Sequence, residues 1–109
     1  MAEFKDAIQA LKDGKRVVRY DWGFRDSFVF MQIPALIHKE TVPIMKSLPD
    51  SVKNEFESRF IKLDSNGKNQ FPNCITYTNW LAFVDSENNI SSWSPSNEDI
   101  FANDWEILD

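Results

Sequence analysis

Two arginines and two aromatic residues lie close together near the N-terminus, at Arg19, Trp22, Phe24 and Arg25. Trp22 occupies a polar stretch between two apolar runs, where a turn exposed to water is expected. Aromatic rings in loops are the usual platform for a planar base, and each stacked base contributes about 1–3 kcal/mol. Arginine binds phosphate through a rigid fork of N–H donors. The pattern predicts a ligand site with Trp22 and Phe24 on the base and Arg19 or Arg25 on phosphate, or else a subunit interface at Trp22.

A second candidate site surrounds Trp93, which comes directly before a Ser-Pro-Ser sequence at 94–96. This sequence is typical of a helix start, where the first backbone N–H groups have no partner within the helix. Such groups bind phosphate well. We therefore expect the N–H groups of Ser96, Asn97 and Glu98, and the hydroxyls of Ser94 and Ser96, to face a phosphate or a ribose.

The other interpretation of Trp80, Trp93 and Trp105 is that these residues are simply core. Trp105 belongs to an apolar terminal stretch, which favours the core. For Trp93 the two interpretations stay open, whereas the loop position of Trp22 favours a ligand site or a subunit interface.

The residues that usually carry catalysis lack the spacing that catalysis needs. His38, the only histidine, lies in a proline-flanked segment without an oriented partner, and Cys74, the only cysteine, begins an apolar run. We interpret them as a surface histidine and a small core residue. Asp99, Asp104 and Glu106 are close in sequence, but carboxylates at a helix start or strand edge usually cap the helix or face water. The sequence predicts no enzyme, no metal site and no cofactor.

Composition narrows the class of partner. The formal charge is 12 − 17 = −5 and the sequence pI is about 4.8, which argues against nucleic acid as a partner because such proteins need a basic face. A small anionic ligand remains compatible, since a few cations and amides can hold a phosphate. The single cysteine, the absence of a signal-peptide pattern and the lack of a long apolar run predict a cytoplasmic protein with no membrane partner.

The first two thirds of the chain predict two helices and a hairpin. Apolar residues recur with helical spacing over about residues 3–12, and Asp13-Gly14 ends this helix. Residues 15–20 and 27–33 form the two strands of a hairpin with a long exposed loop. Residues 34–49 contain three prolines and are expected to be irregular, followed by a helix near 49–59.

The last third predicts a second hairpin, a short helix and a closing strand. Residues 63–73 form a loop, and residues 74–85 form one strand that turns back through 89–93. A short helix follows at 96–102, and Asp104-Trp105-Glu106-Ile107-Leu108 is the final strand. The expected fold is α+β, in which the N-terminal helix packs on a small antiparallel sheet with short additional helices. Residues 1–109 are expected to form one domain.

Three stretches of this pattern resemble a known family. They are Phe4 to Arg19, Asp21-Trp22, and Trp93 to Leu108, the last reading Trp-Ser-Pro-Ser, then Asp-Ile-x-Ala-x-Asp-Trp-Glu-Ile-Leu. Together they resemble the Thoeris anti-defence sponge family, a small phage and prophage domain formerly of unknown function. The stretches bracket the chain, so the resemblance is to the whole domain. The family commonly has a Gly-Trp-Asn-Gly-like turn where this chain has Asp21-Trp22-Gly23-Phe24.

The resemblance implies a protein that is not an enzyme and that binds and sequesters the nucleotide signal of a bacterial immune system. In Thoeris this signal is a cyclic ADP-ribose isomer made by a TIR-domain enzyme, and some members look able to take the cyclic oligonucleotides of CBASS. The resemblance also implies a homotetramer with ligand sites between protomers, acting in the cytoplasm of the host cell if a phage encodes it. Trp22 would then stack on a base or on a neighbouring subunit.

Three other functions remain open from the residues alone. The acidic charge is compatible with a small protein inhibitor that binds a host protein. A nucleotide hydrolase and a phage structural or assembly factor are further alternatives.

Overall fold

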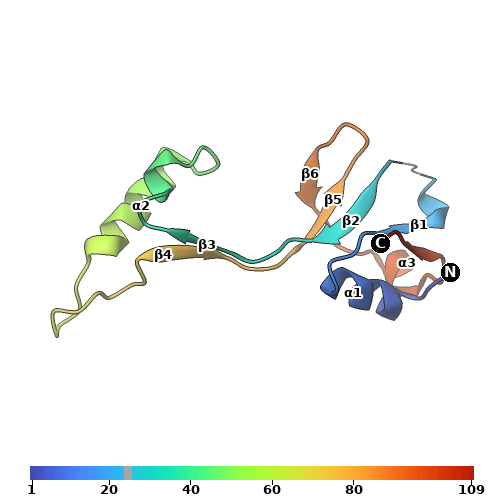
Figure 1. Cartoon of the computed structure of the whole chain (residues 1–109), viewed down its shortest axis with the longest axis horizontal. Helices are drawn as coiled ribbons and strands as arrows, with labels where there is room; N and C mark the ends of the chain where they lie inside the picture. The colour runs from blue at the N-terminus through green and yellow to red at the C-terminus, as the bar shows by residue number, and fades with distance from the viewer. Residues whose placement is uncertain (24–25) are drawn as a thin grey trace. The chain divides into compact units, whose positions relative to one another are not determined.

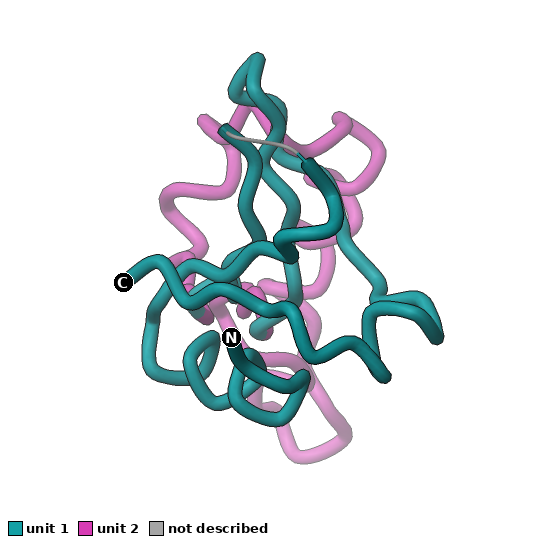
Figure 2. Tube along the Cα trace, turned by 90° about the vertical axis from the view of Figure 1, so that its right-hand side faces the viewer, with its two compact units in different colours: residues 1–33, 79–109 teal, residues 34–78 magenta. Residues whose placement is uncertain are grey.

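The structure is a computed structural model that describes residues 1–23 and 26–109 (Figure 1). The chain divides into two compact units (Figure 2). Residues 1–33 and 79–109 form the first, which we call the terminal unit, and residues 34–78 form the second, which we call the central unit. Helices and antiparallel sheets occur together, which confirms the α+β class.

The terminal unit begins with helix α1, Phe4–Lys12. Its apolar positions follow the helical period, and Ala7, Ala10 and Leu11 are buried. The helix ends where Gly14 takes a positive φ of 84°. The N–H of Gly14 donates to the Leu11 carbonyl and the N–H of Lys15 to the Ala10 carbonyl, which is the Schellman pattern. The prediction of a helix that stops at Asp13-Gly14 is confirmed.

Five antiparallel strands form the sheet of the terminal unit, in the order β6-β5-β2-β1-β7. Their bounds are β1 Val17–Arg19, β2 Phe28–Met31, β5 Leu81–Val84, β6 Ile90–Ser92 and β7 Trp105–Ile107. Two short helices interrupt the connections, namely the 3-10 turn η1 at Tyr20–Trp22 and helix α3 at Asn97–Phe101. The two predicted hairpins, the short helix and the closing strand are all present.

The core of the terminal unit lies between α1 and one face of this sheet. Val17, Val29 and Trp105 point to that face and pack against the buried side of α1. Trp105 is only 1% exposed, which confirms its interpretation as core. We call this the first face of the sheet.

The predicted single strand over 74–85 is wrong. The structure has two strands there, β4 at Cys74–Tyr77 and β5 at Leu81–Val84, which belong to different sheets. The break falls at residues 78–80, because β4 pairs with β3 whereas β5 pairs with β2. Trp80, at the break, is 40% exposed and is therefore not a core residue.

The central unit contains β3 at Ala35–His38, the 3-10 turn η2 at Val42–Ile44 and helix α2 at Asp50–Ile61. Strand β3 pairs with β4, and Val42, Phe60 and Ile75 form the core. The predicted helix near 49–59 is confirmed. The prediction that 34–49 is irregular is wrong at β3, because the prolines flank this strand and leave its own N–H groups in place. His38 is exposed at the end of β3, whereas Cys74 is half-buried rather than a core residue.

Candidate functional site

Three of the four tryptophans gather on the first face of the sheet, in what we call the tryptophan cluster: Trp22, Trp93 and Trp105. The ring centroids of Trp22 lie 5.4 Å from those of Trp105 and 6.1 Å from those of Trp93, and Trp93 lies 6.0 Å from Trp105. All three pairs meet edge to face, an arrangement that aromatic rings prefer. Trp22 and Trp93 are half-buried and Trp105 is buried. The cluster therefore has a closed inner member and two members that reach water.

The expectation that Trp22 lies in an exposed loop is wrong in one respect. Trp22 ends the turn η1, and Gly23 follows with a left-handed φ of 68°. This turn brings the indole back onto the sheet, where it also meets Phe83 edge to face at 6.0 Å. A tryptophan occupies this polar stretch because its side chain returns to the core while its neighbours Asp21 and Gly23 stay exposed.

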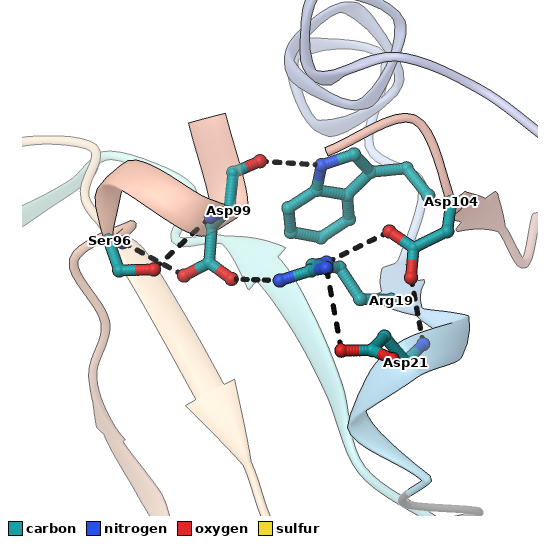
Figure 3. A network of polar contacts seen from close by, with 6 residues as sticks. Arg19, Asp21, Ser96, Asp99 and Asp104 are labelled. Atoms are coloured by element: carbon teal, nitrogen blue, oxygen red, sulfur yellow. Dashed lines mark hydrogen bonds and ion pairs between the residues drawn. The ribbon is translucent and has the colours of Figure 1, made fainter. Parts of the chain in front are cut away.

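Arg19, on β1, lies beside the tryptophan cluster and binds three carboxylates (Figure 3). Its Nη1 lies 3.0 Å from Oδ1 of Asp99, and its Nε lies 2.9 Å from Oδ1 of Asp104. Its Nη2 lies 3.8 Å from the exposed Asp21. The other oxygen of Asp104 accepts the backbone N–H of Asp21 at 2.8 Å. We call these four residues the arginine–carboxylate network.

The network is mostly buried, and its charges are held by hydrogen bonds. The Arg19 side chain is 10% exposed, and Asp99 is 7% exposed. The hydrogen bond to Asp104 raises the pKa of Arg19 above its ordinary value, against the opposing effect of burial. The hydrogen bond from Arg19 lowers the pKa of Asp104 more than burial raises it.

Asp99 has the densest set of partners. Burial raises its pKa, but hydrogen bonds from the Ser96 backbone and from Arg19 outweigh burial, with further contributions from the side chains of Ser96 and Trp22. The pKa of Asp99 therefore lies below its ordinary value. Since Arg19 carries one positive charge and its partners three negative ones, the network has a net charge of 1 − 3 = −2.

This arrangement changes the role expected for Arg19. The sequence predicts a phosphate contact, but the guanidinium is already engaged by carboxylates and is largely covered. A phosphate would have to displace them and approach a region of negative charge. In the described structure Arg19 is a positioning residue that joins β1 to the segment 99–104.

The start of α3 is also used internally. Ser96 is the N-cap, and its Oγ accepts the Asp99 N–H at 3.1 Å while its own N–H donates to Oδ2 of Asp99 at 2.9 Å. The expectation that the Ser96 N–H is free for a ligand is therefore wrong, because a capping box satisfies it. Ser94 and Asn97 are exposed on either side of Ser96.

The structure thus brings Arg19, Trp22, Trp93 and Ser96 together, with Ser94 and Asn97 at their border. Phe24 and Arg25, the remaining predicted site residues, lie outside the described residues. The sequence analysis missed the pairing of Asp99 and Asp104 with Arg19. The signal was Arg19 itself, because an arginine that continues an apolar strand needs carboxylate partners if it is to be buried.

A shallow cleft lies elsewhere on the terminal unit, between the start of α1 and the end of α3. It has a volume of about 450 Å³, and Phe4, Ile100 and Phe101 supply its apolar lining. None of the residues predicted to bind a ligand lines it.

Two further properties bear on function. Within residues 1–23 and 26–109, no group of three or more histidine, cysteine, aspartate or glutamate side chains is placed to hold a metal ion. None of the helices in the same ranges has both the length and the apolar character needed to cross a membrane.

Comparison with known proteins identifies relatives over almost the full chain. The model of the Thoeris anti-defense 2-like domain matches residues 2–108. The protein Thoeris anti-defense 2 of Bacillus phage SP01 is 24% identical over 105 residues, which cover 96% of this chain and 92% of that protein.

Proposed function

The chain belongs to the Thoeris anti-defense 2-like family, and we propose that it is a phage-type anti-defence protein that binds a cyclic nucleotide immune signal and sequesters it intact. The family match over residues 2–108 is the observation that carries this proposal. The first candidate signal is the cyclic ADP-ribose isomer of Thoeris, and the second is a cyclic oligonucleotide of CBASS. Sequestration would take place in the cytoplasm of the host cell.

The half-buried rings of Trp22 and Trp93 are the proposed place for the base. Their centroids are 6.1 Å apart and the buried Trp105 supports both from below. A platform that is already packed loses little side-chain entropy when a base stacks on it. Ser94 and Asn97, exposed at the border of the cluster, are proposed to bind ribose hydroxyls.

The phosphates of the ligand are proposed to face away from the arginine–carboxylate network. Its net charge of −2 would repel them, so Arg19 acts through the position of Trp22 and α3 rather than by contact. Backbone amides and arginines outside the network, with Arg25 as the sequence-based candidate, would supply the phosphate contacts.

The proposed affinity is within reach of such a site. A sponge must bind below the signal concentration that activates the effector, and a Kd of about 10 nM corresponds to about −11 kcal/mol. One or two stacked bases contribute about 1–3 kcal/mol each, and charge-assisted and hydroxyl hydrogen bonds supply the rest. We propose a homo-oligomer, with a tetramer favoured, in which neighbouring protomers complete the ligand site.

We propose binding rather than catalysis because of how the carboxylates beside the tryptophan cluster are held. Asp99 and Asp104 have lowered pKa values and accept internal hydrogen bonds, so at neutral pH they are ionised and poorly suited to donate a proton.

The test begins with purified protein incubated in extract from cells whose TIR enzyme has been activated. After desalting, bound molecules are released by heat and identified by mass spectrometry. Recovery of an intact cyclic ADP-ribose isomer at near-stoichiometric amount is the expected result. A released but cleaved nucleotide would support a hydrolase instead. An empty protein with the signal in the flow-through would overturn the Thoeris assignment, and a retained host protein would support the inhibitor alternative.

A further inference from the structure

The five-stranded sheet has a second face, opposite to the one that carries α1. Because side chains alternate along a strand, residues next to the buried Val17, Val29 and Phe83 point to this face. The strand register places Phe28, Val84 and Ile90 side by side across β2, β5 and β6. Val18 continues this row on β1, followed by Glu106 on β7. The row is apolar except at its β7 end.

A second row on the same face runs beside the first. Phe30 on β2 pairs with Ala82, and Ala82 pairs with Ser92. The rings of Phe28 and Phe30 are 6.4 Å apart. These two rows form what we call the second-face patch: Val18, Phe28, Phe30, Ala82, Val84 and Ile90.

The described helices of the terminal unit all lie on the other side of the sheet. Helix α1 packs on Val17, Val29 and Trp105, and α3 lies beside α1 (Figure 1). The turn η1 contributes Trp22 to that same side. On the second face Ile90 is 61% exposed, and Phe28, Phe30 and Val84 are only half-buried. A sheet with apolar side chains on both faces usually buries the second against another layer.

Charges at one end of the patch indicate what this layer is. Arg16 lies over the Phe28 ring, with its guanidinium carbon 5.2 Å from the ring centroid, and pairs with Asp109 at 2.7 Å. Glu106 lies on the same face, next to Val18. Both signs of charge thus border the patch at its β1–β7 end. At the other end, the stretch from Asn88 to Asn97 contains no charged residue, although the whole chain carries −5.

We propose that a second copy of this chain docks on the second-face patch, with the two sheets packed face to face. A contact between identical copies related by a two-fold axis must be self-complementary. The patch meets this condition because its uncharged middle can pack on itself, while Arg16 of each copy can approach Glu106 of the other. A partner of one dominant sign would meet charges of both signs there. The inference rests on the homo-oligomer of the proposed function and assigns one of its interfaces.

The test compares two exposed isoleucines by sedimentation velocity at several protein concentrations. Ile90→Glu places a charge in the patch, whereas Ile44→Glu places the same charge at a position that is 76% exposed in the central unit. We expect the wild type and Ile44→Glu to assemble alike, and Ile90→Glu to raise the dissociation constant of the assembly at least ten-fold. Ile90→Thr, which keeps strand propensity, is expected to act in the same direction.

The fold of each variant is checked by far-UV circular dichroism, and nucleotide retention is measured on the same samples. Assembly of Ile90→Glu and Ile90→Thr at the wild-type dissociation constant would overturn the inference and assign the interface elsewhere. A wild type that is monomeric at all concentrations would also overturn it, and would leave the patch to another part of the chain or another protein. An assembled wild type that retains no nucleotide would overturn the sponge function alone.

Discussion

The indole Nε1–H of Trp105 donates a 3.0 Å hydrogen bond to the main-chain carbonyl oxygen of Asp99. The side chain of the same aspartate binds Arg19 and caps α3. One residue therefore connects the innermost ring of the tryptophan cluster with the arginine–carboxylate network. A change at either end should reach the other through Asp99.

Replacement of Asp99 by alanine should lower the free energy of unfolding by about 3 kcal/mol. Removal of one partner from a buried ion pair typically costs about 3–5 kcal/mol, and the lower end applies because Asp104 still binds Arg19. Urea denaturation at pH 7 measures the change. Glu57→Ala, at an exposed position of α2, serves as the control and should stay within about 0.5 kcal/mol. A similar small change for Asp99→Ala would contradict a stabilising network.

Stability should fall as the solution becomes acidic, beginning near the ordinary carboxyl pKa of 3.8. The pKa values of Asp99 and Asp104 are lower in the folded protein than in the unfolded chain. Their contribution is therefore complete well above pH 3.8 and is lost as the pH falls through the lowered values. Urea denaturation between pH 7 and pH 3 measures this dependence. Asp99→Asn should show a shallower decline than the wild type, and parallel curves would show that Asp99 does not cause it.

Nucleotide binding should depend on Trp22 more than on Trp80. Trp22→Phe keeps an aromatic ring in the cluster but reduces the stacking surface, whereas Trp22→Ala removes the platform. A loss of about 1–3 kcal/mol for one stacked base corresponds to about a 5- to 150-fold rise in Kd for Trp22→Ala. Titration calorimetry with the recovered nucleotide measures it.

Trp80→Ala is the matched control for this series, because Trp80 is 40% exposed and lies outside the tryptophan cluster. Its Kd should remain within about two-fold of the wild type. An equal loss at both positions would place the base elsewhere, and no loss at Trp22 would remove this residue from the site.

The two serines around Pro95 should separate structure from binding. Ser96→Ala removes the N-cap of α3 and should cost about 1 kcal/mol of stability. Ser94→Ala should leave stability almost unchanged, since Ser94 is exposed, but should weaken nucleotide binding if Ser94 contacts the ribose. Thermal denaturation and calorimetry of both variants check the assignment. Loss of binding at Ser96 alone, beyond its effect on stability, would instead place the ligand at the start of α3.

Much of the terminal unit could be predicted from the sequence because its signals are local. The helical period of α1, the Asp13-Gly14 stop and the Ser-Pro-Ser start of α3 each act within a few residues. Strand β3 was missed because its partner β4 lies far along the chain and the segment between them contains two of the prolines. The apolar run over 74–85 could not show that its hydrogen-bond partner changes at residues 78–80.

The candidate site was predictable in its aromatic residues but not in its charges. Trp22 and Trp93 attract attention by type and position, and the structure brings them together. Whether Arg19 faces a ligand or a carboxylate depends on the approach of Asp99 and Asp104, about 80 residues later in the chain. That approach follows from the pairing of β1 with β7, which sequence spacing alone does not define.

The central unit enters and leaves the terminal unit through neighbouring strands, since Met31 on β2 is the register partner of Leu81 on β5. Topologically it is an insertion in what would otherwise be a single hairpin. No member of the arginine–carboxylate network or of the tryptophan cluster lies within residues 34–78. During evolution this segment can therefore lengthen, shorten or be exchanged as a cassette, while selection on the framework acts through residues 1–33 and 79–109.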